Sequence, residues 1–356
     1  MYRKSFTFDG RRYYVRADSP EELIEKVTRK KADLEHDKRC ISRNMKVEDW
    51  IEEWMTVYKE PIVSDGWLKN IRSMMDSCVI TEIGKMRLKD VRPTHLQRIL
   101  NAKSDCSASY IKKLAVLLDE LFEQALCNDL VLKNPAKSLS RPQGTPQKDR
   151  RSITDIERAA ILDFCEHHWS GLFLKLQLFC GFRPSEAAAL TWSDVDLASD
   201  PPRINISKSA KFDGQVGAPK SKAGYRSVPI PDELLPDLSA PGANPFGYVC
   251  LNKSGRMIRP DTFKSVWKVA RHHMNVFMGC RTFRNELVPP YPLADDFTMY
   301  CLRHTYCTDL EKAGVPINVA SRLMGHSSLE LTAKIYTHDS EEVFASAAKK
   351  INKIAR

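Results

Sequence analysis

The chain has 356 residues, and its 55 lysines and arginines exceed its 45 aspartates and glutamates, which gives a formal net charge of +10. At roughly 150 residues per domain, this length predicts two or three domains. A hydrophobic content of 42% and a charged content of 28% exclude a disordered chain, a collagen and a coiled-coil rod. No segment approaches the roughly 18 apolar residues of a membrane span and the first residues lack a signal-peptide core, so we expect a cytoplasmic protein with no membrane partner.

The positive charge is spread along the chain, which suits either a protein that contacts phosphates through several modules or one that is merely soluble. The cysteines include no C-x-x-C pair, and the histidine pairs at 167–168 and 272–273 lack metal-ligand spacing. We therefore expect reduced and mostly buried thiols, with neither a metal ion nor a cofactor.

Residues 1–40 are predicted to form a β-hairpin followed by a helix. Two β-forming runs flank the turn dipeptide Asp9-Gly10, and Pro20 stands where a helix would begin. The hairpin carries Arg11, Arg12 and Arg16 beside two tyrosines. This composition fits a ribbon that reads nucleic acid, or an edge strand that charge protects from pairing.

Residues 45–139 are predicted to contain four or five short helices. Between Ile111 and Ala125, for example, apolar residues recur at steps of three and four, which places them on one helix face. Proline and glycine interrupt the pattern after Asn134, so we expect an interdomain linker over residues 140–151.

From residue 152 the pattern is helical again, with one interruption. Between residues 202 and 230, alternating segments and the dipeptides Asp213-Gly214 and Ala223-Gly224 predict a small β-sheet with hairpin turns. Residues 343–356 carry an apolar stripe at helical spacing, which predicts a terminal helix. The expected fold class is mainly α with small β-sheets (α+β).

Four short stretches contain candidates for chemistry. The first, residues 180–186 (CGFRPSE), places Arg183 between a helix that Gly181 ends and a helix that Pro184 begins. The free N–H groups there favour an anion, although an arginine three residues before a glutamate is commonly a surface ion pair. The other three stretches, within residues 219–229, 300–305 and 323–338, contribute Lys222, Tyr300, Arg303, His326 and Tyr336.

In this order, the four stretches resemble the tyrosine recombinase family, also called phage integrases. The catalytic boxes of that family contain an arginine in a G-x-R-x-x-E context, a hairpin lysine, H-x-x-R, L-G-H and a tyrosine about ten residues further on. The resemblance covers most of residues 150–340. It implies an arm-type DNA-binding domain over 1–40, a helical core-binding (SAM-like) domain over 45–139, and a mixed α/β catalytic domain over 152–356 with a C-terminal helix.

The resemblance also implies a reaction without metal or cofactor. Tyr336 would attack a DNA phosphodiester and form a 3′-phosphotyrosyl bond. Arg183 and Arg303 would clamp the phosphate, while Lys222 would protonate the leaving 5′-oxygen. His326 would hydrogen-bond a phosphate oxygen and assist proton movement.

The implied partners are double-stranded DNA with attachment sites, three further copies in a homotetramer on DNA, an excisionase and a DNA-bending host factor. The protein would be bacterial or phage-encoded and associated with the nucleoid when active. Two alternatives stay open: an enzyme similar to type IB topoisomerases that nicks and reseals one duplex, and a DNA-binding regulator without catalysis.

Tyr300 differs from the usual residue of the family, and the lysine of the second stretch has two candidates. Tyr300 stands where the family usually has histidine, and a phenol can donate a hydrogen bond but cannot shuttle protons at neutral pH, so we expect a hydrogen-bonding role only. Lys220 lies two residues before Lys222 and would share its strand face, so it competes for the role of general acid. Lys222 is preferred because it is nearer the turn at Gly224.

Overall fold

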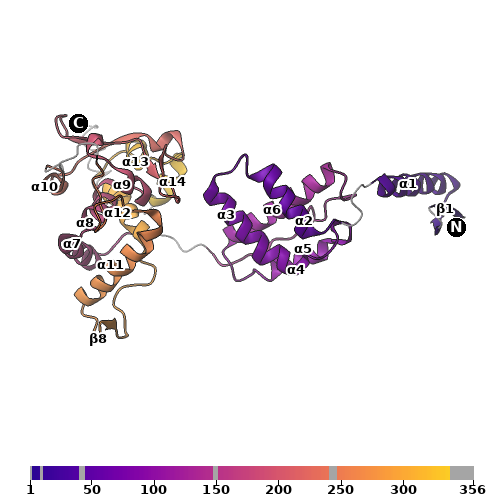
Figure 1. Ribbon diagram of the computed structural model, residues 1–356, viewed down its shortest axis with the longest axis horizontal. Helices are drawn as coiled ribbons and strands as arrows, with labels where there is room; N and C mark the ends of the chain where they lie inside the picture. The colour runs from indigo at the N-terminus through magenta and orange to yellow at the C-terminus, as the bar shows by residue number, and fades with distance from the viewer. Residues whose placement is uncertain (1, 9–10, 40–44, 147–150, 240–246, 337–356) are drawn as a thin grey trace, which may run out of the picture. The chain divides into compact units, whose positions relative to one another are not determined.

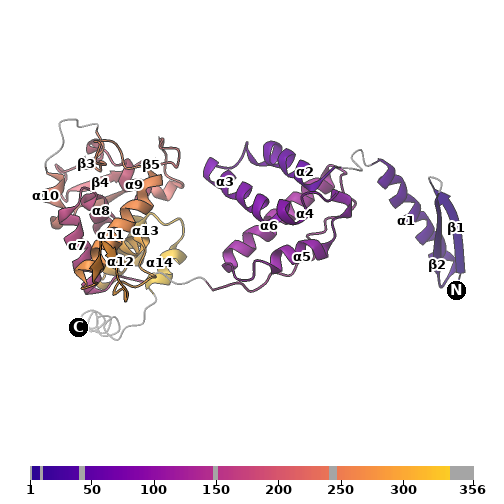
Figure 2. The same ribbon diagram turned by 60° about the horizontal axis from the view of Figure 1, so that its bottom comes forward.

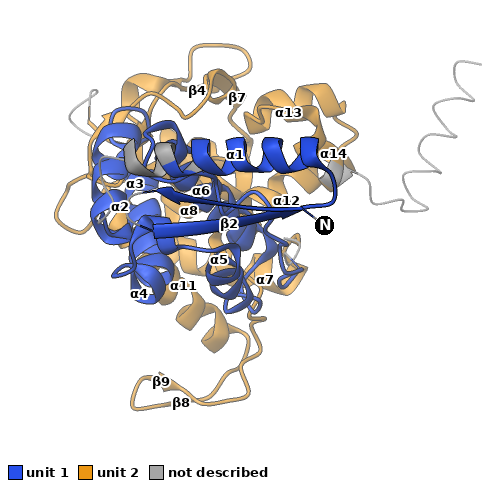
Figure 3. Cartoon of the chain, turned by 90° about the vertical axis from the view of Figure 1, so that its right-hand side faces the viewer, with its two compact units in different colours: residues 1–147 blue, residues 148–356 orange. Residues whose placement is uncertain are grey.

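The computed structural model describes residues 2–8, 11–39, 45–146, 151–239 and 247–336. The chain divides into two compact units, residues 1–147 and 148–356 (Figure 3). The division falls inside the segment expected to be a linker. The turn dipeptide Asp9-Gly10 and the expected terminal helix over 343–356 lie outside the described residues. Among the helices that are described, none combines the length and apolar character needed to cross a membrane.

The chain begins with an antiparallel hairpin and a helix, as predicted (Figure 2). The elements are β1 (Tyr2–Phe8), β2 (Arg11–Ala17) and α1 (Pro20–Arg39). The hydroxyl of Ser19 accepts a hydrogen bond from the backbone N–H of Glu22 at 3.2 Å, which satisfies one of the free donors at the helix start. Ser5 lies opposite Tyr14 in the register, and this pairing fixes which side chains share a face of the hairpin.

Residues 45–139 contain four helical segments, which confirms the prediction for this region. They are α2 (Val47–Trp54) with its π-helical continuation η1 (Met55–Lys59), then α3 (Asp65–Met74), η2 (Met75–Ile80) and α4 (Thr81–Ile83) as one segment, then α5 (Pro93–Asn101) after the 3₁₀ turn η3 (Leu88–Asp90), and α6 (Ala108–Cys127). Trp50, Trp54 and Phe122 are fully buried in their common core. The indole of Trp50 donates to the carbonyl of Leu121 at 3.1 Å, so α2 is held on α6 by a buried hydrogen bond as well as by packing.

The second unit is mixed, as expected for an α+β domain (Figure 1). Its helices are α7 (Asp155–His167), α8 (Gly171–Cys180), α9 (Pro184–Ala189), α10 (Leu235–Leu238), α11 (Phe263–Phe277), α12 (Met299–Lys312), α13 (Ile317–Met324) and α14 (Leu329–Tyr336), with 3₁₀ turns η4 (Trp192–Asp194), η5 (Lys222–Gly224), η6 (Asp232–Leu234) and η7 (Pro260–Thr262). The strands are β3 (Val195–Asp196), β4 (Arg203–Ile206), β5 (Ser209–Ala210), β6 (Val216–Gly217), β7 (Arg226–Pro229), β8 (Thr282–Phe283) and β9 (Glu286–Leu287).

A small sheet between residues 202 and 230 is confirmed, with a hairpin turn at Asp213-Gly214 between β5 and β6. The hairpin turn predicted at Ala223-Gly224 is wrong, because β6 pairs with β5 and β7 pairs with β4. Strands β3, β4 and β7 form an antiparallel sheet in that order, with Ile204 opposite Val228. Both side chains are fully buried, so one sheet face packs on the core. The short pair β5 and β6 continues the connection from β4 toward η5. This sheet therefore carries the Lys222 segment at its end.

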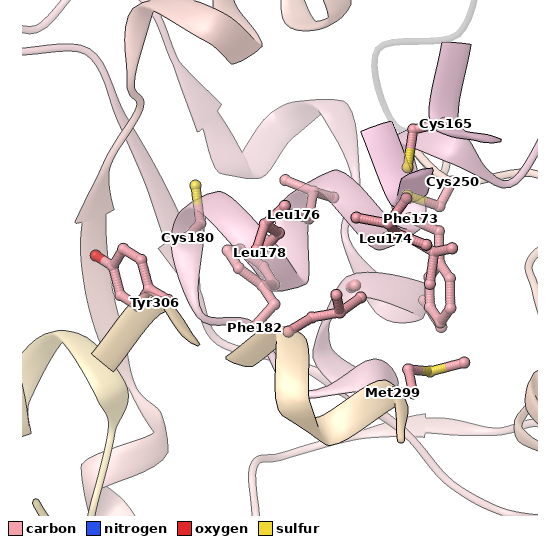
Figure 4. Close-up of a cluster of buried hydrophobic side chains, with 14 of the residues drawn as sticks. Cys165, Phe173, Leu174, Leu176, Leu178, Cys180, Phe182, Cys250, Met299 and Tyr306 are labelled. Carbon is pink, nitrogen blue, oxygen red and sulfur yellow. The ribbon is translucent and has the colours of Figure 1, made fainter. Parts of the chain in front are cut away.

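Helix α8 is the centre of the second unit. Its sequence GLFLKLQLFC is apolar except for Lys175 and Gln177, and most of its residues are buried. The side chains of Phe173, Leu174, Leu176 and Leu178 lie in the core together with Met299 and Tyr306 of α12 (Figure 4). Burial of each large apolar side chain contributes about 1.5–3 kcal/mol. The C-terminal end of this well-packed helix is where the first candidate catalytic stretch begins.

Candidate active site

Arg183 is placed by the end of one helix and the start of the next, as predicted. Gly181 ends α8 in the left-handed conformation with φ 62°, and Pro184 begins α9 directly after Arg183. The guanidinium of Arg183 forms an ion pair with Glu186 at 2.7 Å and donates to the carbonyl of Gly325 at 2.8 Å. Its side chain is 34% exposed, so this guanidinium is held by the protein while one side stays open to solvent.

Arg303 lies beside Arg183 but is buried. It projects from α12 and donates to the carbonyls of Gly181 and Met324. Gly181 is required at this point because a Cβ there would lie 2.3 Å from the ring of Tyr306. Burial lowers the pKa of Arg303, and the positive charges of Arg183 and Arg226 lower it further. An arginine nevertheless keeps its charge at neutral pH.

A buried carboxylate compensates these cations. Glu186 has a side chain that is only 2% exposed, and it accepts hydrogen bonds from both terminal nitrogens of Arg226, at 3.1 and 2.9 Å. Burial disfavours its charged form, but the hydrogen bonds and charge of Arg226, with Arg183 and Arg303, outweigh burial and lower its pKa. One carboxylate among three guanidinium groups leaves an excess of positive charge at the site.

The sequence analysis missed the roles of Glu186 and Arg226. A surface ion pair of Arg183 and Glu186 was the alternative to a catalytic arginine, but the glutamate of this pair is buried. The signal available in the sequence was the G-x-R-x-x-E motif itself, because it includes the glutamate. Arg226 lies 40 residues from Glu186 and had no comparable signal.

His326 lies next to the two arginines in space. It follows Gly325, which ends α13 in the left-handed conformation with φ 62°. Its Nδ1 lies 2.8 Å from the hydroxyl of Thr332, a fully buried residue of α14. Tyr336 is the last residue of α14, one helical turn beyond Thr332. This contact therefore ties the histidine to the helix that carries the candidate nucleophile. The side chain of Tyr336 lies outside the described residues.

We expect His326 to be neutral at the pH of the cell. Burial lowers its pKa to about 4, with contributions from the charges of Arg303, Arg183 and Arg226. Since a histidine in the unfolded chain has a pKa of about 6.5, the unfolded state binds the proton first, and His326 should make the folded state less stable as the pH falls from 6.5 toward 4. We expect the melting temperature of wild type to drop more steeply between pH 7 and pH 5 than that of His326→Gln. Equal slopes in thermal unfolding scans would contradict this assignment.

The predicted local structure of Lys222 is wrong. The prediction placed Lys222 on a hairpin turn and Lys220 on the same strand face, but neither residue is on a strand. Lys222 begins the 3₁₀ turn η5, and Lys220 precedes this turn in an irregular segment. Gly224 packs against Pro219, where a Cβ would lie 2.4 Å from that ring, so this close contact favours a tight turn over an extended strand. Both lysines are exposed, and strand alternation cannot distinguish them.

A hollow of about 450 Å³ lies between the η5 segment and α13. Its lining includes Ala223, Tyr225, Arg322 and His326. The Lys222 turn and the histidine therefore border one open space, although they are far apart in the sequence.

Tyr300 is the remaining candidate of the catalytic boxes. It lies in the first turn of α12, three residues before Arg303, and it is 41% exposed. Its position on the arginine's own helix is compatible with the hydrogen-bonding role expected for it.

The candidate arm residues belong to the first unit and are on the hairpin. Arg12 and Arg16 share the face that also carries Arg3 and Tyr14, since Arg3 pairs with Arg16 in the register and its guanidinium lies 4.5 Å from the centre of the Tyr14 ring. Arg11 is on the opposite face. Lys31 of α1 approaches Phe6 on that opposite face, so α1 packs against that face, although Arg11 itself is exposed.

The chain is similar to known families and relatives. The profile described as phage integrase family matches residues 151–342, and that of the phage integrase N-terminal SAM-like domain matches residues 46–104. A tyrosine recombinase XerC-like protein of Caldanaerobacter subterraneus subsp. tengcongensis is 26% identical over 85% of this chain and 81% of its own. The transposase from transposon Tn916 of Enterococcus faecalis is 23% identical over 79% of this chain and 71% of its own.

Solved structures show the same fold. The Tn1549 transposon integrase in complex with a circular intermediate DNA superposes with a TM-score of 0.66 at 18% identity, over 86% of this chain and all of the other. The lambda integrase tetramer bound to a Holliday junction gives a TM-score of 0.57 at 16% identity, over 91% and 93% of the two chains.

Fold, site and relatives together define a tyrosine recombinase, an enzyme that breaks and rejoins DNA. More specifically, the chain belongs to the phage integrase family, since the family profile matches more than half of it.

Proposed function

We propose that this chain is a site-specific recombinase that integrates or excises a mobile element through a 3′-phosphotyrosyl intermediate. The observation that carries the proposal is the convergence of Arg183 and Arg303 on the segment before His326, through their hydrogen bonds to the carbonyls of Gly325 and Met324. Two guanidinium groups and a neutral imidazole at one point suit a phosphodiester, whose charge increases in the transition state.

In the proposed reaction, the oxygen of Tyr336 attacks the phosphorus. A bond forms between that oxygen and phosphorus, the phenol gives up its proton to water, and the bond from phosphorus to the 5′-oxygen breaks. Lys222 gives a proton to the departing 5′-oxygen, while Arg183 and Arg303 neutralise the non-bridging oxygens. His326 and Tyr300 act as hydrogen-bond donors to the phosphate. Attack by the 5′-hydroxyl of another strand then reverses the step and joins the strands without external energy.

The proposed assembly is a homotetramer on double-stranded DNA that contains attachment sites. Support comes from the lambda integrase tetramer, a structural neighbour bound to a Holliday junction. We further propose that residues 1–40 bind arm-type DNA sites, residues 45–139 bind the core site, and residues 152–356 catalyse the reaction, with 140–151 as the linker. An excisionase and a DNA-bending host factor would set direction, and the protein would act on DNA in the cytoplasm, at the nucleoid.

A suicide substrate tests the reaction directly. A nicked DNA duplex with the attachment site releases its short 5′-hydroxyl fragment after cleavage, so the covalent adduct accumulates and is visible on a denaturing gel. Wild type should give the adduct, whereas a DNA-binding regulator would bind the site and give none. Relaxation of a plasmid without any recombination site, by monomeric protein, would favour the topoisomerase-like alternative.

The arm hairpin yields a prediction about DNA affinity. Arg12→Ala and Arg16→Ala should each weaken binding to arm-site DNA by about threefold to tenfold and lower the salt dependence, because each removes one cation from the uncovered face. Arg11→Ala is the matched control: Arg11 is exposed but lies on the face against which α1 packs, so the affinity should change less. Titrations of arm-site DNA at several salt concentrations measure the affinity and its salt dependence. An equal loss of affinity in all three variants would contradict the assignment of faces.

A further inference from the structure

Arg226 lies in the second candidate stretch, four residues after Lys222, and the family resemblance implied no role for it. It begins β7, two residues after the Lys222 turn ends at Gly224. Its side chain is only 4% exposed. Every nitrogen of its guanidinium group donates to a protein acceptor: Nε to Leu323 at 2.6 Å, Nη1 to Glu186 at 3.1 Å and Gly224 at 3.3 Å, and Nη2 to Glu186 at 2.9 Å. This guanidinium is therefore shielded and occupied, in contrast to that of Arg183.

The acceptors of Arg226 belong to three different parts of the active site. Glu186 is also the ion-pair partner of Arg183. Gly224, whose carbonyl is the second acceptor, is the last residue of the turn that Lys222 begins. The carbonyl of Leu323 lies in the last turn of α13, shortly before His326. A single planar group therefore connects the segments that carry an arginine, the lysine and the histidine.

The packing around Gly325 supports this connection independently. A Cβ on Gly325 would lie 2.8 Å from the carbonyl oxygen of Ala223 and 2.9 Å from Nη1 of Arg226. The turn that carries Lys222 therefore packs directly on the residue before His326, with Arg226 at the same contact. Because Lys222 is exposed and on a flexible stem, the backbone of its turn is the part that the protein can fix in place.

We propose that Arg226 is a positioning residue, which holds the Lys222 turn against the phosphate site so that the lysine reaches the leaving 5′-oxygen. The inference rests on the proposed function and adds a residue to it. Arginine suits this position because its planar fork bonds the two carboxylate oxygens of Glu186 and the two carbonyls together. A lysine would keep the charge but has a single nitrogen, so it cannot maintain the four contacts.

The test uses two DNA substrates that differ in one atom. In the first, the scissile phosphate has its normal 5′-bridging oxygen, and in the second that oxygen is replaced by sulfur. A thiolate leaves without a proton because thiols have a pKa of about 8.5, far below that of an alcohol. The bond from the tyrosine oxygen to phosphorus forms and the P–S bond breaks in the second substrate, so general acid catalysis is no longer needed.

We expect Arg226→Lys to cleave the oxygen substrate about 10²-fold more slowly than wild type and to regain most of that loss on the sulfur substrate. Lys222→Ala should show the same pattern, while the affinity for DNA stays within about twofold in both variants. Arg151→Lys is a matched control, since Arg151 forms a similar two-bond pair with buried Glu157, at 2.7 and 2.6 Å, outside the site. Arg151→Lys should have the same ratio of cleavage rates on the sulfur and oxygen substrates as wild type.

The ratio of the sulfur rate to the oxygen rate decides the outcome. It is measured on one preparation, so a partly unfolded variant still gives a valid ratio, and Arg226→Gln provides a second case. The inference is overturned if Lys222→Ala raises this ratio while both Arg226 variants have the same ratio as wild type. An unchanged ratio in Lys222→Ala overturns the acid role of Lys222 and the inference with it. Absence of any adduct from wild type on both substrates would instead reject the proposed function.

Discussion

Tyr336→Phe should abolish the covalent adduct with DNA and leave DNA binding intact. The phenol oxygen is the atom that would form the bond to phosphorus, and phenylalanine lacks it, so we expect a loss of at least about 10³-fold in adduct formation. The change removes one oxygen from the end of α14 and keeps the ring. Gel-shift titrations should therefore show an affinity within about twofold of wild type.

The matched control is Tyr300→Phe, which removes the phenol oxygen of the other tyrosine in the candidate site. Tyr300 is expected to donate a hydrogen bond only, so this variant should still form the adduct, at a rate reduced by about tenfold or less. Mass spectrometry of the adduct after proteolysis should locate the DNA on the peptide that contains Tyr336. An adduct of Tyr336→Phe, or DNA attached to another residue, would show that the nucleophile has been misassigned.

Arg183→Lys should lose most of the cleavage activity, about 10²-fold to 10³-fold, although the charge is conserved. Arg183 uses one terminal nitrogen for Glu186 and the other for the carbonyl of Gly325, which orients the plane of its guanidinium group at the open side of the site. A lysine ammonium can replace one of these contacts but cannot present a planar pair of donors to a phosphate.

Single-turnover cleavage of the suicide substrate measures this effect, since it separates the chemical step from product release. Arg158→Lys is the control, because Arg158 pairs with Asp309 at 2.6 Å on α12 but belongs to none of the catalytic boxes. We expect it to cleave at a rate close to that of wild type. Near-normal cleavage by Arg183→Lys would show that Arg183 does not clamp the phosphate.

Some of the site could be predicted because the information is local. Gly181 and Pro184 mark the end of one helix and the start of the next, and the structure confirms both positions around Arg183. The hairpin before Pro20 and the small sheet around Ile204 follow from alternation and turn residues, which act within a few residues of chain. The order of the boxes identified the family, which the family profile confirms.

The other contacts of the site depend on residues that are far apart in the chain. No local pattern in the sequence indicates that Arg303 donates to Gly181, 122 residues away, or that Arg226 pairs with Glu186. The position of Lys222 was misjudged for a related reason. Its turn is set by packing of Gly224 on Pro219 and by the bond from Arg226, and neither contact appears in the alternation of residues.

By itself, the sequence determined the class of fold, the residue types available for catalysis and their order. Helix ends, turns and family motifs each depend on a few neighbouring residues, so the sequence alone is enough to predict them. Only the tertiary structure decided that Glu186 is buried among three arginines, that burial lowers the pKa of His326, and that Arg226 joins three segments of the site. The physical reason is that burial and electrostatic shifts arise from all groups packed around a side chain, and folding alone brings those groups together.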